Sequence, residues 1–100
     1  MRTYSVRFTP EAEAHLAAIQ DYIAAQGRPE NAADFVDAIS NRCIKIGDVP
    51  FGGTPRDDLI AGARTVSFKG KTTIIYMIEG EEVFIQGIFY GGRDIDGHYS

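Results

Sequence analysis

The run Thr-Thr-Ile-Ile-Tyr-Met-Ile at residues 72–78 decides the fold. Its β-branched and aromatic side chains are apolar on both faces, which predicts a central strand. A Lys-Gly-Lys turn at 69–71 separates this run from a shorter predicted strand at 65–68. On its other side, a charged turn at 79–82 leads into a third long strand at 83–90. These three strands predict a meander.

The segment before the meander carries the strongest periodic pattern in the chain, a helix that starts near Pro29 or Asn31. Its apolar residues follow helical steps of three and four over four turns. They are Ala32, Phe35, Val36, Ile39, Cys43 and Ile46. Gly47 and Pro50 are predicted to end this helix, because neither residue favours its continuation.

A second helical segment and a short strand lie nearer the N-terminus. Thr9 is a predicted cap, Pro10 suits the first helical position, and Gly27 is the predicted stop. The apolar positions of this helix are Leu16, Ile19 and Ile23. Residues 3–8 alternate polar and apolar side chains, as a strand with one buried face does. The short connection between the two helices predicts an antiparallel helical hairpin.

The predicted element order is therefore β-α-α-β-β-β. Residues 48–63 are rich in Gly and Pro and are expected to form an ordered loop with one short turn at 57–60. The helical hairpin should pack on one face of an antiparallel sheet, which gives a two-layer α+β fold and leaves the other sheet face uncovered. The length of 100 residues predicts a single domain at 1–100.

Composition and charge narrow the function classes. The net charge of −4 argues against a protein held to nucleic acid by its overall field. The chain nevertheless has a local excess of basic residues between 52 and 76, which is either a basic face or an ordinary mixed surface. We find no apolar run of membrane-spanning length and no signal peptide, and the single Cys43 cannot form an internal disulfide. These features predict a cytoplasmic protein.

The sequence also lacks the common motifs of catalysis and metal binding. One cysteine and two distant histidines, His15 and His98, cannot supply a zinc site, and no phosphate-binding or nucleophile motif occurs. Cys43 lies on the apolar stripe of its helix and is predicted to be a core residue. His15 is predicted to lie at the surface or at its boundary. We therefore expect no metal and no cofactor.

Several short segments, in this order and at this length, resemble one family. The segments are Thr9-Pro10-Glu11-Ala12, Pro50-Phe51-Gly52, Gly62-Ala63-Arg64, Ile75-Tyr76 and Ile88-Phe89-Tyr90-Gly91-Gly92-Arg93-Asp94. Together they look like the RelE/ParE superfamily of small bacterial toxins, and within it the ParE-type, or plasmid-stabilisation, branch. The resemblance covers nearly the whole chain.

That resemblance implies a fold and a function. The first strand would lie beside the last. The chain would be the toxin of a type II toxin–antitoxin system, bound in a hetero-oligomer by a ParD-like antitoxin encoded next door. The antitoxin would contact DNA, so the toxin would reach DNA only through it. ParE-type toxins inhibit DNA gyrase and are regarded as protein binders, so no enzymatic activity is expected.

Two alternatives remain open at this stage. RelE-type relatives are ribosome-dependent mRNA endonucleases, which need basic residues around the phosphate and an acid or base side chain. Arg64, Arg93 and Tyr99 are the candidates for those roles here, although the acidic net charge argues against docking on ribosomal RNA. In the second alternative, the chain would be a non-toxic relative that only binds the antitoxin.

The antitoxin surface is predicted from side chains that the fold leaves without an obvious cover. Apolar residues lie on both faces of the predicted sheet, and the helical hairpin covers only one of them. Arginines near this surface would suit an acidic antitoxin segment. The predicted antitoxin-binding residues are Arg56, Arg64, Phe68, Tyr90 and Arg93.

Overall fold

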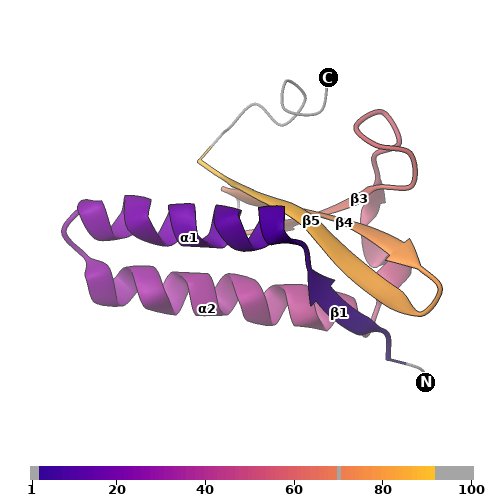
Figure 1. The fold of residues 1–100 in the computed structure, drawn as a ribbon, viewed down its shortest axis with the longest axis horizontal. Coiled ribbons are helices and arrows are strands. Elements are labelled where there is room, and N and C mark those ends of the chain that lie inside the picture. Colours follow the sequence, from indigo (N-terminus) through magenta and orange to yellow (C-terminus); the bar gives the residue numbers. More distant parts are fainter. Residues whose placement is uncertain (1–2, 70, 92–100) are drawn as a thin grey trace.

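The computed structural model describes residues 3–69 and 71–91, which form two helices packed on one face of a five-stranded sheet (Figure 1). The strands are β1 (Ser5–Phe8), β2 (Thr54–Pro55), β3 (Arg64–Phe68), β4 (Thr72–Glu79) and β5 (Glu82–Tyr90). The helices are α1 (Pro10–Ala25), α2 (Pro29–Ile46) and the 3-10 turn η1 (Pro50–Gly52). The two-layer α+β fold predicted from the sequence is confirmed. Neither α1 nor α2 is long and apolar enough to cross a membrane.

The strand order in the sheet is β1-β5-β4-β3-β2. The last three long strands form the predicted antiparallel meander, and the first strand lies beside the last. β1 runs parallel to β5, with Ser5 opposite Glu82, so the prediction of a wholly antiparallel sheet is wrong at this edge. A parallel pair needs a long crossover, which the helical hairpin supplies. The two-residue β2 is an additional strand within the predicted loop.

The ends of the helices follow the predicted signals. The side-chain oxygen of Thr9 accepts a hydrogen bond from the backbone N–H of Ala12, so Thr9 caps α1 with Pro10 at the first helical position. Gly27 follows the end of α1 with a φ of +88°, a conformation that L-residues other than glycine rarely adopt. α2 ends at Gly47, as predicted.

The main hydrophobic core lies between the helical hairpin and the sheet. Its fully buried side chains include Ile39 and Cys43 of α2 with Tyr76 and Ile85 of the central strands. Cys43 is therefore a core residue, as predicted, and burial raises the pKa of its thiol to about 12. At neutral pH the thiol stays protonated and is a poor nucleophile.

An irregularity in β5 decides which residues face that core. Ile75 pairs with Gly87 and Tyr76 pairs with Ile85, so Gln86 has no partner on β4. This extra residue is a β-bulge, and it shifts the alternation of side chains along the strand. As a result, the side chains that β5 directs towards the helices come from both odd- and even-numbered positions. They are Val83, Ile85, Ile88 and Tyr90.

The second face of the sheet is partly covered. A small apolar cluster there joins Leu59 and Ala63, from the segment between β2 and β3, to Ile75 and Phe89 of the central strands. An internal hydrogen bond stabilises the conformation of this segment: the carboxylate of Asp57 accepts it from the N–H of Gly62 at 2.8 Å. The expectation that this face is wholly uncovered is therefore wrong, since the predicted loop packs against it.

Candidate interaction site

The predicted antitoxin-binding residues fall into separate places. Phe68 and Tyr90 lie close together on the helix side of the sheet, where the ring of Phe35 is 6.2 Å from the first and 5.4 Å from the second. Arg56 pairs with Asp58 at 2.9 Å in the segment that covers the opposite face. Its guanidinium lowers the pKa of that exposed carboxyl group through a direct hydrogen bond.

Arg64 lies at the start of β3, and its side chain binds the loop that contains Phe51 and Gly53. Its guanidinium donates to the carbonyl oxygens of Phe51 at 3.0 Å and Gly53 at 2.8 Å. It also lies 5.3 Å from the centre of the Phe51 ring, a favourable cation–π geometry. The other predicted residues, Arg93 and Tyr99, lie outside the described residues.

The side chain of Tyr76 holds the same loop from the core. Its hydroxyl donates to the carbonyl of Pro50 at 2.7 Å and accepts from the N–H of Gly53 at 2.9 Å. A Cβ at Gly53 would overlap this hydroxyl, so only glycine fits at this position of the loop. Burial raises the pKa of Tyr76 above its ordinary value. The hydroxyl therefore remains protonated and anchors η1 at neutral pH.

This anchored loop forms one wall of a cavity of about 420 Å³ beside the C-terminal end of α2, which we call the basic groove. It is lined by Arg42, Lys45, Ile46, Asp48, Val49, Gly52, Gly53 and Val66. Two large apolar side chains near it are mainly exposed, Val49 at 65% and Phe51 at 61%. An apolar patch next to two cations is a surface suited to a protein segment.

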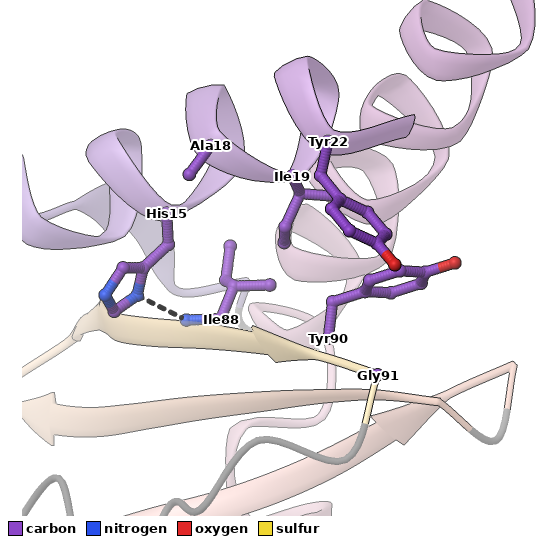
Figure 2. Close-up of a pocket in the computed structure, with 7 residues that line it drawn as sticks. All are labelled: His15, Ala18, Ile19, Tyr22, Ile88, Tyr90 and Gly91. Atoms are coloured by element: carbon purple, nitrogen blue, oxygen red, sulfur yellow. Dashed lines mark hydrogen bonds between the residues drawn. The ribbon is translucent and has the colours of Figure 1, made fainter. Parts of the chain in front are cut away.

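A second cavity of about 230 Å³ lies between α1 and the end of β5, and we call it the helix–strand groove (Figure 2). It is lined by His15, Ala18, Ile19, Tyr22, Ile88, Tyr90 and Gly91. Figure 2 shows the side chains of His15, Ile19 and Tyr22 extending from α1 towards the strand. The rings of Tyr22 and Tyr90 meet at 6.2 Å in an edge-on arrangement and close one end of the groove.

His15 has a role in this groove that the sequence analysis missed. Its Nδ1 accepts a hydrogen bond of 3.1 Å from the backbone N–H of Ile88, and its ring lies 5.1 Å from that of Phe89. The side chain is half-buried, which agrees with the predicted boundary position. The spacing of His15, Ala18 and Tyr22 on one helix face is the signal that could have found the groove.

The basic groove combines apolar and charged lining residues, whereas the helix–strand groove is lined by apolar and aromatic side chains together with His15. Within the described residues, no group of three His, Cys, Asp or Glu side chains is placed to hold a metal ion. The helical hairpin over a meander, together with the two grooves, defines the class of the protein, a small two-layer α+β domain with surfaces suited to protein binding. Within that class, a family model described as "ParE toxin of type II toxin-antitoxin system, parDE" matches residues 6–95, and the chain belongs to this ParE toxin family.

Solved structures agree with that assignment. A chain from the chromosomal ParDE toxin–antitoxin system of P. aeruginosa is similar, with a TM-score of 0.78 and 26% identity, over 89% of this chain and 97% of that one. A chain from the toxin–antitoxin complex RelBE2 of Mycobacterium tuberculosis matches with a TM-score of 0.65 and 21% identity, over 88% and 98%, which shows a shared fold. Curated protein sequences give no match.

Proposed function

We propose that this ParE-type toxin inhibits DNA gyrase in the cytoplasm by binding it as a protein, and that a ParD-like antitoxin neutralises it. The observation that carries the proposal is the family match over residues 6–95. The similarity to a chain of the ParDE system, over nearly the full length of both chains, supports a ParD-type partner. In this proposal, the toxin has no catalytic step and acts only through its surfaces.

The position of Arg64 supports a binder over a ribonuclease. Cleavage of RNA of the RelE kind needs cations that can reach the developing charge on a phosphorane. The guanidinium of Arg64 instead donates to two loop carbonyls and packs on the ring of Phe51. Moving it onto a phosphate would break both hydrogen bonds. The side chain of this arginine, a predicted candidate for RNA cleavage, therefore stabilises the loop.

We propose the basic groove as the docking site of an acidic antitoxin segment. Arg42 and Lys45 supply positive charge on α2, against the single carboxylate of Asp48 among the lining residues. Val49 and Phe51 supply exposed apolar area that an apolar anchor of the antitoxin would bury. Charge complementarity of this kind speeds association and selects the correct partner.

Expression with and without the adjacent gene tests the function. Cells that express the toxin alone should form filaments and induce the DNA-damage response, and co-expression of the neighbouring frame should restore growth. Purified toxin should then inhibit supercoiling of relaxed plasmid by purified gyrase. Translation arrest with mRNA cut at the ribosomal A site would overturn the gyrase proposal. Normal growth at good expression, with no effect on gyrase, would identify a non-toxic antitoxin binder.

A further inference from the structure

The edge of β3 that faces away from β4 is only partly covered. β2 pairs with β3 at Arg64 and Thr65 and not beyond, because the chain before Thr54 leaves the sheet and forms η1. β3 itself continues to Phe68, and within this last part Ser67 is exposed to solvent. In the part of the chain that the structure describes, no strand pairs with the edge at Ser67.

Two contacts fix the direction in which the backbone of Ser67 points. The carbonyl of Ala63 accepts a hydrogen bond of 2.8 Å from the N–H of Arg56, which directly follows β2. The carbonyl oxygen of Thr65 also points to the β2 side, because a Cβ placed on Gly53 would lie only 3.0 Å from it. Successive strand residues point to opposite edges, so Ser67 directs its N–H and its C=O to the same side as Ala63 and Thr65. These two exposed backbone groups are a template for pairing with a further chain segment.

The basic groove lies on the helix side of this edge. Val66 lines the groove, and its side chain packs against the main core. If a residue of an added antiparallel strand lay opposite Ser67, its two neighbours would lie opposite Val66 and Phe68 and point to the same face as these side chains. One side chain would then enter the groove beside Val66, where the cavity of about 420 Å³ has room for it. The other would contact the ring of Phe68.

The charges around the groove indicate an acidic side chain at the first of these positions. Arg42 and Lys45 line the groove from α2, against one carboxylate, that of Asp48. Among the described residues, neither cation forms an ion pair. Lys69 adds a third positive charge just after β3, where its ammonium group lies 5.6 Å from the centre of the Phe68 ring. A carboxylate in the groove would complement these charges.

We propose that an extended acidic segment of the antitoxin adds to β3 as an antiparallel strand in line with β2. Its central residue exchanges both backbone hydrogen bonds with Ser67. The following residue places a carboxylate beside Arg42 and Lys45, and the preceding residue places an apolar side chain on Phe68. This mode of binding rests on the antitoxin docking proposed above, to which it adds the backbone pairing and the order of an apolar, a free and an acidic position.

A short capped peptide with Leu-Thr-Glu at its centre tests the pairing on the wild-type protein. Titrated into the isotope-labelled full chain, it should shift the amide signals of Val66, Ser67 and Phe68 saturably. N-methylation of the central threonine removes the donor to Ser67 and should weaken binding roughly tenfold. The matched control is N-methylation of the glutamate, whose N–H points away from β3, and it should leave the affinity nearly unchanged. Equal effects of the two, or no saturable shift, would overturn the strand pairing.

The acidic position is tested by replacing the glutamate of the peptide with lysine. The lysine peptide should bind roughly tenfold more weakly at low salt, because it meets Arg42 and Lys45 with a like charge. The difference between the two peptides should shrink as the salt concentration rises, since salt screens the interaction. Equal affinity of the two peptides at low salt would contradict the acidic side chain in the groove.

Two substitutions of one residue separate its backbone from its side chain. Ser67→Pro removes the N–H at the open edge without removing a hydrogen bond to β4, as edge strands tolerate. It should abolish peptide binding and keep the wild-type amide spectrum in the core. Ser67→Ala keeps the N–H and should bind the peptide as the wild type does. Binding that survives Ser67→Pro would overturn the pairing, and if that variant does not fold, the N-methylated peptides decide the question on the unaltered chain.

Two further measurements separate this proposal from its alternatives. Protection of the Ser67 amide from hydrogen exchange in the free protein, together with a dimer in sedimentation, would assign the edge to a second copy of the chain and overturn the proposal. Peptide binding by a chain that leaves gyrase active would contradict only the function proposed above. Gyrase inhibition that the antitoxin relieves, without peptide binding, would contradict only the strand pairing.

Discussion

At the scale of single residues, two buried polar side chains have different uses. The hydroxyl of Tyr76 satisfies a carbonyl and an N–H of the η1 loop, and so fixes the loop that presents Phe51 to solvent. The thiol of Cys43 lies among apolar side chains and keeps its proton. The first residue organises a candidate binding surface, and the second fills space in the core.

Removal of the Tyr76 hydroxyl should destabilise the protein and loosen the loop. In Tyr76→Phe, the carbonyl of Pro50 and the N–H of Gly53 lose their buried partner, which should cost about 1–3 kcal/mol of unfolding free energy. Urea denaturation monitored by circular dichroism measures this loss. The control is Tyr22→Phe, whose side chain is 59% exposed and whose change should stay within about 0.5 kcal/mol. Equal effects of the two variants would contradict the anchoring role.

The buried thiol should make stability fall in mild alkali. The pKa of Cys43 is about 12 in the folded protein against an ordinary 9.0, so above about pH 9 the unfolded chain loses a proton that the folded chain keeps. Stability is then full below pH 9 and should fall with a slope of about 1.4 kcal/mol per pH unit above it. Denaturation curves between pH 8 and pH 10 test this, with Cys43→Ala expected to show a flatter profile.

At the scale of elements, the bulge in β5 determines which residues reach the helices. If Gln86 were a regular strand residue paired with β4, strict alternation after Ile85 would turn Ile88 and Tyr90 to the other sheet face. The bulge brings both onto the helix side, where Ile88 is buried and Tyr90 meets Phe35. The helix–strand groove therefore depends on one unpaired strand residue.

Deletion of Gln86 should consequently preserve the fold, because it removes the bulge and leaves Ile88 and Tyr90 on the helix side. In the deletion variant, strict alternation through Gly87 still turns the side chains of Ile88 and Tyr90 towards the helices, so the loss of stability should stay below about 3 kcal/mol. Gln86→Ala keeps the bulge and should change stability by less than about 1 kcal/mol. Thermal unfolding together with near-ultraviolet circular dichroism compares them. A deletion variant that unfolds, or that loses the near-ultraviolet signal of its packed tyrosines, would contradict this account of the bulge.

At the scale of the whole molecule, charge is distributed unevenly around the fold. The net charge is −4, and α1 carries only acidic residues among its charged side chains. The basic groove, at the C-terminal end of α2, presents Arg42 and Lys45 instead. The basic groove therefore suits a segment of negative charge, which the field of the molecule would orient as it approaches.

Charge reversal in the basic groove should weaken the antitoxin complex selectively. The double variant Arg42→Glu with Lys45→Glu should raise the antitoxin Kd about tenfold to a hundredfold at low salt, and the loss should shrink as salt rises. Isothermal titration calorimetry at two ionic strengths measures both effects. The matched control, Lys71→Glu, lies outside the groove and should leave the Kd nearly unchanged. An unchanged Kd in the double variant would move the antitoxin to another surface.

The sequence by itself determined the local structure of this protein. Thr9 with Pro10 marked the start of α1, the steps from Ala32 to Ile46 marked the buried face of α2, and the run 72–78 marked the central strand. These features depend on side-chain preference and periodicity between residues close in the chain. Local signals of this kind can be recognised in the sequence without knowledge of the rest of the fold.

Only the tertiary structure decided how distant residues meet. The parallel pairing of β1 with β5, the bulge at Gln86 and the hydrogen bond from Ile88 to His15 join parts of the chain more than 70 residues apart or depend on strand register. The tertiary structure also separated Arg56, Arg64 and Phe68, which the sequence analysis had assigned to one antitoxin-binding surface. The physical reason is that register and packing are set by contacts across the sheet and the core, which adjacent residues do not encode.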